Sequence, residues 1–487
     1  MKTLYWFIIY NYIMNKTKKN MKTKKNLSIN DINSNDYKYI IVGCGLFGLL
    51  LAKLLSENNK VLLIEAGPII YTKTYNTHLN RRNIYNIIND FPSKNSVWKI
   101  PYKQIKTSNN SPTLNPTPNP YIFGGRSLYW GGNANIPIYD DIKNESQEFI
   151  DNFYYYLNDA IKLLNLKTYK KPNWLYNFIN KKDIFEASYA LLNNVPLCNI
   201  SDILHNNNIT IISNCKIVKC LLENNDNKIK KVDGLVTSKG YINTKYSNVI
   251  LSCGTFENNS ILLASNINFN KLNNVIGTNF THHLASKFVI RILKNSIKNI
   301  VYEPFILHPN SDFYVMFRYI KSNDNYAYIN IAGFAKVYEN YYGRRLFYNK
   351  KTKNDESNNL LLVYNLNKKD KDNWDTMDNY IDNFIFKFPS LELFIDNKFV
   401  KSDKIDISSL KDKQKFWINR RQPLISCEHE SGGTCYGKVV NIHGQVKNIS
   451  NLFINGPSVL PTIGGFSPCI LTTCMLLNLY NYLIKTQ

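Results

Sequence analysis

The chain has 487 residues, of which 44% are hydrophobic and 13% aromatic, so it is long and apolar enough for two globular domains with sizeable cores. Its 60 Lys and Arg residues against 36 Asp and Glu give a net charge of +24, which alone would suggest a nucleic-acid partner. No RNA-binding motif or arginine-rich helix accompanies that charge, and Asn, Lys, Ile and Tyr are abundant together, as AT-rich codons produce, so the composition argues against nucleic-acid binding.

The first residues combine a short apolar run, Leu4 to Met14, with a strongly basic stretch behind it. The run is too short to span a bilayer, and no small-residue cleavage site follows it. Three interpretations stay open: an anchor on a membrane surface, a targeting peptide of unusual order, or an upstream start codon with Met14 or Met21 as the true start. We expect residues 1–35 to form a disordered or targeting leader whose basic residues allow weak membrane contact, on a protein that is otherwise cytoplasmic.

A segment that begins at Tyr37 reads as a strand, a Gly-x-Gly-x-x-Gly turn, an apolar helix and a second strand that ends on Glu65. In such a turn Gly43 permits the tight bend, Gly45 lets the backbone approach a pyrophosphate, and Gly48 lets helix and strand pack closely. The helix N-terminus then faces the anion, and a carboxylate about 20 residues downstream accepts hydrogen bonds from a ribose. The segment therefore predicts an α/β fold with a Rossmann-like, dinucleotide-binding domain.

Three later segments carry further signals. A glycine-rich loop, Phe123 to Pro137, contains paired glycines that let backbone amides approach a flat ring. Asn248 to Ser265 reads as a buried strand, a turn at Gly254 and the start of an apolar helix. The C-terminal block contains HESGGTCYG and, after GGFSP, a closing apolar helix. Ahead of the glycine-rich loop, the Pro-rich stretch Ser111 to Tyr121 is equally well an exposed lid or a plain linker.

Together these segments resemble the glucose-methanol-choline (GMC) family of FAD-dependent alcohol oxidoreductases. The resemblance implies an FAD with its pyrophosphate at the glycine turn, its ribose on Glu65, and its isoalloxazine between the glycine-rich loop and the C-terminal block. Some members attach the flavin covalently through a histidine where this chain has Tyr129, so we expect a non-covalent FAD. The cofactor-binding residues that the resemblance implies are Gly43, Gly45, Leu46, Phe47, Gly48, Glu65, Ala66, Gly125, Ser127, Asn133, Ile217, Gly254, Gly456 and Pro468.

In the family the C-terminal block carries the chemistry, with a His in H-x-x-G-T-C and an Asn or His at the turn before the closing helix. By that pattern His429 is the general base, which takes the hydroxyl proton of an alcohol or sugar as hydride passes to flavin N5. Ser467 would help to hold the substrate oxygen. A neutral imidazole titrating near pH 7 suits the task of the base.

The chain departs from the family pattern in two places. One extra residue lies between His429 and Thr434, which puts Glu430 at the family offset, and Ser467 stands where relatives read Asn or His. A displacement of about 1 Å at a catalytic base can cost 10² in rate. Either the site has been retuned for another substrate or it has lost activity. The alternatives to an alcohol oxidoreductase are a degenerate, non-catalytic FAD scaffold that serves as a structural or interaction module, and an enzyme for an amine or a C=C bond.

The flavin segments predict a discontinuous FAD-binding domain made of residues 36–70, 121–140, 200–285 and 427–487. The remaining residues, 71–120, 141–199 and 286–426, would form an α+β substrate domain. There, segments that alternate β-branched or aromatic residues with polar ones predict an antiparallel sheet that roofs the flavin.

Some local expectations accompany this division. We expect a helix at Phe153 to Leu166, beside the predicted sheet. The strand Val249 to Leu251 should find antiparallel partners in TIISNCKIVKC and in Lys231 to Thr237. We interpret His282 and His283, which end a family-like stretch near the domain junction, as structural.

Nine cysteines, scattered and without a C-x-x-C pair, indicate free and mostly buried thiols in a reducing compartment. The histidines are not spaced with Cys or carboxylates in a ligand pattern, so we expect no metal site. The sequence leaves open which alcohol or sugar is the substrate, what accepts the electrons, whether the enzyme is an oxidase or a dehydrogenase, and the oligomeric state.

Overall fold

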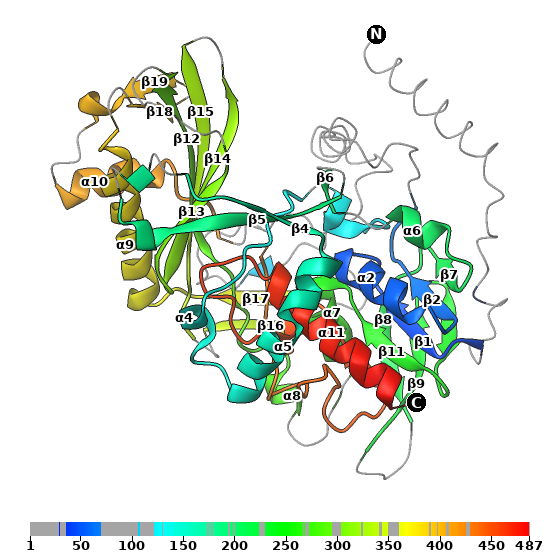
Figure 1. Cartoon of the computed structure of the whole chain (residues 1–487). Coiled ribbons are helices and arrows are strands. Elements are labelled where there is room, and N and C mark those ends of the chain that lie inside the picture. The colour runs from blue at the N-terminus through cyan, green and yellow to red at the C-terminus, as the bar shows by residue number, and fades with distance from the viewer. Residues whose placement is uncertain are drawn as a thin grey trace, which may run out of the picture.

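A five-stranded parallel sheet carries the glycine turn, in the strand order β20-β11-β1-β2-β7. Its strands are β1 (Tyr39–Val42), β2 (Val61–Ile64), β7 (Ile209–Ile212), β11 (Asn248–Leu251) and β20 (Leu452–Ile454). They are short apolar runs rich in Val, Ile and Leu, as a parallel sheet covered on both faces requires. Strands far apart in the sequence thus meet in one sheet, at the lower right of Figure 1.

The computed structural model describes residues 29, 36–69, 106–107, 121–128, 130–172, 175–176, 179–192, 195–197, 200–223, 229–265, 267, 272–294, 303–322, 325–339, 343–348, 360–388, 391–396, 398–405, 409–424 and 429–486. The apolar run of the predicted leader, most of the Pro-rich stretch and Tyr129 lie outside the described residues. Among the helices that these ranges contain, none has the length and apolar content needed to cross a bilayer.

Alternate side chains of β1 enter two different cores. Tyr39 and Ile41 lie in a core shared with helices, whereas Ile40 and Val42 lie in a core beneath a three-stranded antiparallel sheet. The helices are α2 (Leu46–Leu55), α5 (Gln147–Leu163) and α11 (Cys469–Lys485), and the covering strands are β8 (Ile217–Leu222), β9 (Val232–Thr237) and β10 (Gly240–Asn243). The parallel sheet is therefore covered on both faces. The carboxyl ends of its strands stay open for a ligand site.

The expected antiparallel partners of the strand Val249 to Leu251 are wrong. That strand, β11, pairs in parallel with β1 and β20. The segment TIISNCKIVKC contains two strands instead of one: β7 pairs in parallel with β2, and β8 pairs with β9 in the covering sheet. The chain turns between them at Asn214, which has a positive φ of 54°. Alternation alone could not show this turn, because apolar residues continue on both sides of it.

An antiparallel sheet of nine strands forms the second half of the molecule, at the upper left of Figure 1. Its order is β19-β18-β12-β15-β14-β13-β5-β4, and β6 pairs with β5. The strands are β4 (Leu166–Tyr169), β5 (Ile184–Leu192), β6 (Val195–Pro196), β12 (Leu284–Leu293), β13 (Phe305–Asn310), β14 (Phe313–Ser322), β15 (Tyr326–Ala335), β18 (Leu391–Ile395) and β19 (Lys398–Lys401). Helix α9 (Lys368–Ile385) packs across β12, β14 and β15. The predicted α/β fold with a Rossmann-like sheet and a separate antiparallel sheet is confirmed.

Shorter elements complete the described fold. A small sheet contains β16, β17 and β3, and short helices connect the larger elements. These elements are β3 (Lys106–Thr107), β16 (Arg344–Tyr348), β17 (Leu360–Tyr364), α4 (Tyr139–Ile142), α6 (Ile200–Leu204), α7 (Gly254–Ala264), α8 (Leu272–Val275) and α10 (Leu410–Ile418), with 3₁₀ turns η3 (Gly125–Leu128), η5 (Lys181–Asp183), η8 (Ser402–Lys404) and η9 (Pro457–Val459).

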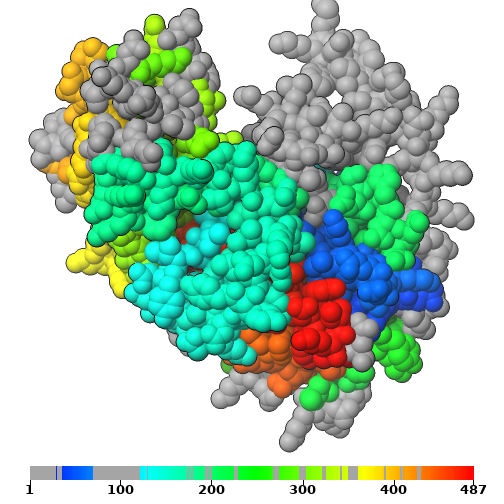
Figure 2. Space-filling view, in the orientation of Figure 1, coloured from blue at the N-terminus to red at the C-terminus, as the bar shows by residue number. Residues whose placement is uncertain are grey.

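The helix predicted at Phe153 to Leu166 is α5, which begins earlier. Ser146 caps it, because its hydroxyl oxygen accepts a hydrogen bond from the Phe149 N–H at 3.3 Å. Helix α5 packs against α11, in the core of the parallel-sheet half. In the space-filling view the cyan and blue-green atoms that follow residue 121 lie across the front of the molecule, between the antiparallel sheet and the blue and red segments (Figure 2). The two-domain boundaries stay a prediction.

Candidate functional site

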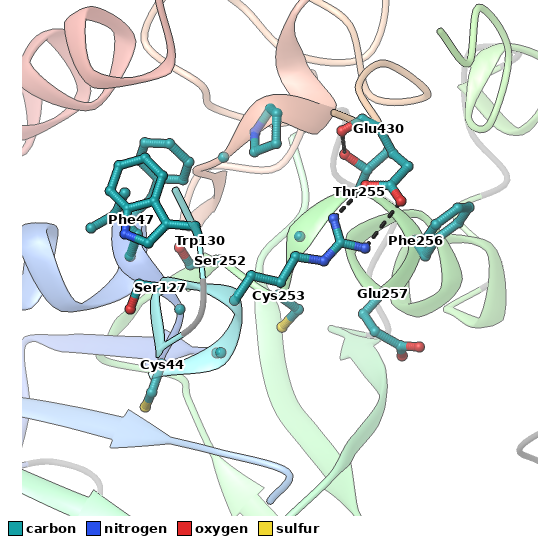
Figure 3. Close-up of a pocket in the computed structure, with 18 of the residues that line it drawn as sticks. Cys44, Phe47, Ser127, Trp130, Ser252, Cys253, Thr255, Phe256, Glu257 and Glu430 are labelled. Atoms are coloured by element: carbon teal, nitrogen blue, oxygen red, sulfur yellow. Dashed lines mark hydrogen bonds and ion pairs between the residues drawn. The ribbon is translucent and has the colours of Figure 1, made fainter. Parts of the chain in front are cut away.

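A cavity of about 370 Å³ opens where the parallel strands end. Its walls come from the glycine turn, the glycine-rich loop, the start of α7, the antiparallel sheet and the C-terminal block (Figure 3). All the site residues predicted from the sequence, except Gly48, line it. This volume lies in the range of small-molecule and cofactor sites, and the position is the one where open α/β sheets bind ligands.

The three glycines of the turn have different surroundings. Gly43 has a φ of +97°, and a Cβ there would lie 2.6 Å from the Ser252 carbonyl oxygen. A Cβ at Gly48 would lie 2.1 Å from the Gly43 oxygen, so this residue serves helix packing and not the cavity wall. A Cβ at Gly45 would meet no protein atom within 4 Å. Gly45 also precedes α2, which has no side-chain cap, so the free N–H groups of the first turn suit a pyrophosphate.

Filling the space above Gly45 should weaken FAD binding and leave the fold intact. We expect Gly45→Val to weaken FAD binding roughly 5- to 150-fold, as overpacking by about 1–3 kcal/mol implies, and Gly45→Ala to weaken it less. The melting temperature of the apoprotein should hardly change in either variant, because the added carbon meets open space. Gly43→Ala is the contrast: its Cβ would strike the backbone, so the apoprotein itself should melt lower. Unchanged FAD affinity in Gly45→Val would contradict the placement of the pyrophosphate.

Glu65 lies at the end of β2, with both carboxylate oxygens engaged. They accept hydrogen bonds from the backbone N–H groups of Cys44 and Gly67, each at 2.9 Å. Burial raises the pKa of Glu65 to about 7, although these N–H groups favour the charged form. The neighbouring Ala66 and, on β8, Ile217 line the same part of the cavity. A carboxylate with lone pairs remaining beside an apolar wall suits a ribose next to an adenine.

In the glycine-rich loop, the polar groups are bonded largely within the protein. Ser127 donates its hydroxyl to the Gly124 oxygen at 2.7 Å and so closes η3. Asn133 donates its amide to the Met316 sulfur at 2.9 Å. The Asn133 carbonyl accepts the hydroxyl proton of Ser467 at 3.0 Å, which ties the loop to the C-terminal block. The expected hydrogen bonds of Ser127 and Asn133 to a flavin stay predictions.

An ion pair that the sequence did not predict crosses one wall of the cavity. Arg126 donates to both carboxylate oxygens of Glu430, at 2.5 and 3.0 Å, and these bonds are dashed in Figure 3. Thr255, at the start of α7, donates its hydroxyl to the Glu430 carbonyl oxygen. Although burial acts to raise the pKa of the Glu430 carboxyl, the Arg126 guanidinium holds it below its usual value. The sequence offered one signal for this pair: the charged residue Glu430 stands at the offset where the family has its histidine.

His429 lies beside this pair, and its side chain is enclosed by rings. Its imidazole meets that of His283 edge to face, with ring centroids 4.9 Å apart, and lies 5.7 Å from the Phe334 ring. Burial, with His282, Lys287 and Arg126 nearby, lowers the pKa of His429 to about 3. The expectation that this imidazole titrates near pH 7 is therefore wrong, because the sequence did not show that packing against other rings desolvates it. The ring is neutral, as a proton acceptor must be.

Two more buried imidazoles, those of His282 and His283, lie close to His429. His282 and His283 are each 1% exposed, and burial lowers the pKa of both. A ring nitrogen of His282 lies 2.8 Å from the His283 carbonyl oxygen. Neither lines the cavity, but the His283 ring packs edge to face against the His429 ring. Among the residues that the structure describes, no cluster of His, Cys, Asp or Glu is arranged to hold a metal ion.

These histidines predict a loss of stability in mild acid. The unfolded chain binds protons on them near pH 6.5, whereas the folded chain, with its depressed pKa values, does not. Their contribution is therefore fully present above pH 6.5 and is lost as the pH falls from there toward 3, by up to about 1.4 kcal/mol per pH unit for each histidine. Urea unfolding of the holoprotein at several pH values measures the slope, which His429→Gln should make shallower. An equal slope in both proteins would contradict the burial of a neutral His429.

Comparisons with known proteins show what this architecture is similar to. A family model described as GMC oxidoreductase matches residues 194–285, the stretch that contains β7 to β11, α7 and both supporting histidines. The fold is similar to the crystal structure of pyridoxine 4-oxidase from Mesorbium loti, with a TM-score of 0.62 and 13% identity, over 92% of this chain and 99% of that chain. A comparison with curated proteins found no match. The match of residues 194–285 to the family model, together with the likeness in fold, supports the glucose-methanol-choline (GMC) oxidoreductase family for this chain.

Proposed function

We propose that this oxidoreductase oxidises the CH–OH group of an alcohol, with His429 as the base that takes the hydroxyl proton. FAD, when bound, supplies the hydride acceptor. The observation that carries the proposal is a neutral imidazole on the cavity wall whose ring makes no hydrogen bond to any described residue. Its Nδ1 is buried without a partner, so Nε2 is the ring nitrogen left to accept a proton from a substrate in the cavity.

The low pKa of His429 bears on when the hydroxyl proton of the substrate leaves. Transfer of a proton from an alcohol to a base of lowered pKa is uphill by itself, so we propose that the proton leaves together with the hydride of the neighbouring carbon. A carbonyl product then forms without a free alkoxide. Positioned general-base catalysis of this kind contributes about 10² to 10⁴ in rate. Water exclusion by the antiparallel sheet above the cavity strengthens every interaction of the base.

Ser467 lies on the same cavity wall and is 3% exposed. Its hydroxyl proton points to the Asn133 carbonyl oxygen, and rotation about the Cβ–Oγ bond redirects it to a substrate oxygen. We therefore assign Ser467 the task of holding that oxygen while His429 takes its proton. Both departures from the family pattern remain compatible with chemistry, because His429 and Ser467 reach one cavity.

Anaerobic reduction of the purified holoprotein tests the proposal. Alcohols should bleach the visible absorption of the flavin and yield an aldehyde or ketone, while amines and substrates with a C=C bond should not. We expect the FAD to be released by acid, since no covalent bond is proposed. If an amine reduced the flavin and no alcohol did, amine oxidation would take the place of the alcohol oxidation that we propose. Reduction by none of the panel, in a protein that dithionite still reduces, would favour the non-catalytic scaffold.

A further inference from the structure

Five side chains that line the cavity and contact one another form the end nearest the antiparallel sheet, here called the roof end. They are Asn133, Met316, Phe334, His429 and Ser467. Two come from neighbouring strands of that sheet: Met316 lies on β14, and Phe334 on β15 pairs with Tyr314, two residues before Met316. Their side chains consequently project from the same face of the sheet, and they present carbon and sulfur to the cavity.

Apart from His429, the polar tips at the roof end and beside it are bonded to the protein. Trp130 donates its ring N–H to the Leu197 carbonyl oxygen at 2.9 Å. Asn133 uses its amide N–H₂ on the Met316 sulfur, and Tyr189 donates its hydroxyl to the same sulfur at 3.5 Å. Farther along the wall, the guanidinium of Arg126 donates two hydrogen bonds to the carboxylate of Glu430.

Among the described side chains at the roof end, two polar groups remain for a substrate, the imidazole of His429 and the rotatable hydroxyl of Ser467. The Asn133 amide is engaged at both ends, since its oxygen accepts from the Asn135 N–H and its nitrogen donates to Met316. A single hydroxyl group uses both remaining groups, because it donates to His429 and accepts from Ser467. A second hydroxyl that lies against the carbon atoms of Phe334 or the thioether of Met316 finds no strong hydrogen-bond partner in either side chain. A desolvated hydroxyl without a partner costs binding energy, and an apolar pocket discriminates against one added hydroxyl by about 10²-fold.

We infer that the substrate is a monohydroxylic alcohol with an aromatic or alicyclic body, and that sugars and polyols are poor substrates. The inference rests on the proposed function, since it names the substrate class of the same site. The aromatic face of Phe334 and the thioether of Met316 contact the body of the substrate, and His429 and Ser467 hold its one hydroxyl.

Cyclohexylmethanol and D-glucose provide the test. Both have a six-membered ring with a CH₂OH group, and glucose adds further hydroxyls. With the holoenzyme we expect kcat/KM for cyclohexylmethanol and for benzyl alcohol to exceed that for glucose by at least about 10²-fold. Met316→Gln places an amide at the roof end and should narrow this ratio about tenfold, because the added hydroxyls then find a partner. The matched control is Val315→Thr, which adds a hydroxyl on the same strand but on the face toward α9, and should leave the ratio unchanged.

A second readout needs no turnover. Benzaldehyde is the product of benzyl alcohol, and D-glucono-1,5-lactone is the product of glucose oxidised at its anomeric C1–OH, the other CH–OH group that a sugar can present. The two should differ in how they perturb the spectrum of the bound flavin, with benzaldehyde binding more tightly. If no alcohol reduces the flavin but benzaldehyde still binds selectively, the proposed reaction fails and the shape of the site stands. If glucose is oxidised as efficiently as benzyl alcohol, or the lactone binds as tightly as benzaldehyde, the inferred substrate class is wrong whatever the reaction.

Discussion

His429→Ala should reduce the rate of flavin reduction by an alcohol about 10² to 10⁴-fold while the protein keeps its FAD. The expected loss is large because no other described group on the cavity wall is a neutral, unpartnered base: Glu430 is paired to Arg126, and Glu65 is held by backbone N–H groups. Stopped-flow absorbance under anaerobic conditions measures the reduction rate apart from the later transfer of electrons to an acceptor.

Two controls separate catalysis from folding in this experiment. His443→Ala removes an imidazole from the same C-terminal block, where His443 stacks on Tyr482 and contacts Asn478, away from the cavity. That variant should reduce its flavin at the rate of the unmodified protein. Added imidazole should restore part of the rate to His429→Ala, because the truncation leaves space for it. A rate that survives His429→Ala unchanged would refute the assignment of the base.

Breaking the Arg126–Glu430 pair should lower both stability and rate. Glu430→Ala leaves the guanidinium of Arg126 without its partner, and removal of one member of a buried pair costs about 3–5 kcal/mol. Because the Arg126 side chain is 21% exposed, we expect a loss near the lower end of that range. The freed arginine and the shifted backbone next to His429 should also slow flavin reduction. Denaturant unfolding and stopped-flow reduction measure the two effects.

A double-mutant cycle and a second ion pair sharpen this result. The combined change of Arg126→Ala and Glu430→Ala should cost less than the sum of the single changes, since no charge is then left unpaired. Arg291 and Glu392 pair across β12 and β18, with a similarly part-buried arginine, and Glu392→Ala should cost stability without changing the reduction rate. Additive single changes, or an unaltered rate in Glu430→Ala, would show that the pair does not position the base.

The glycine turn could be predicted because its signals are local. Gly43, Gly45 and Gly48 lie within six residues of one another between a strand and a helix, and the apolar strands on either side have the short length that a covered parallel sheet needs. The same holds for the C-terminal block, where spacing around Gly433 and Pro468 indicated the family pattern. The His429 and Ser467 candidates follow from that spacing, and the structure brings both to one cavity.

The remaining parts of the site depend on contacts between distant segments. Arg126 and Glu430 are separated by 304 residues, and no local pattern connects them. Met316 and Phe334 could be assigned to strands from alternation, but which face of the sheet meets the cavity depends on how α9 covers the other face. The pKa of His429 was mispredicted for a related reason, since desolvation by rings from two distant segments is a tertiary effect.

The most direct measurement of the central claim is anaerobic mixing of the holoprotein with benzyl alcohol and with its α-dideuterated form, followed by visible absorption. If a CH–OH group gives hydride to the bound FAD, the flavin is bleached and the deuterated alcohol bleaches it several times more slowly. Benzaldehyde should appear in amounts equal to the reduced flavin. Flavin that stays oxidised with benzyl alcohol and every other alcohol, although dithionite reduces it, would contradict alcohol oxidation at this site.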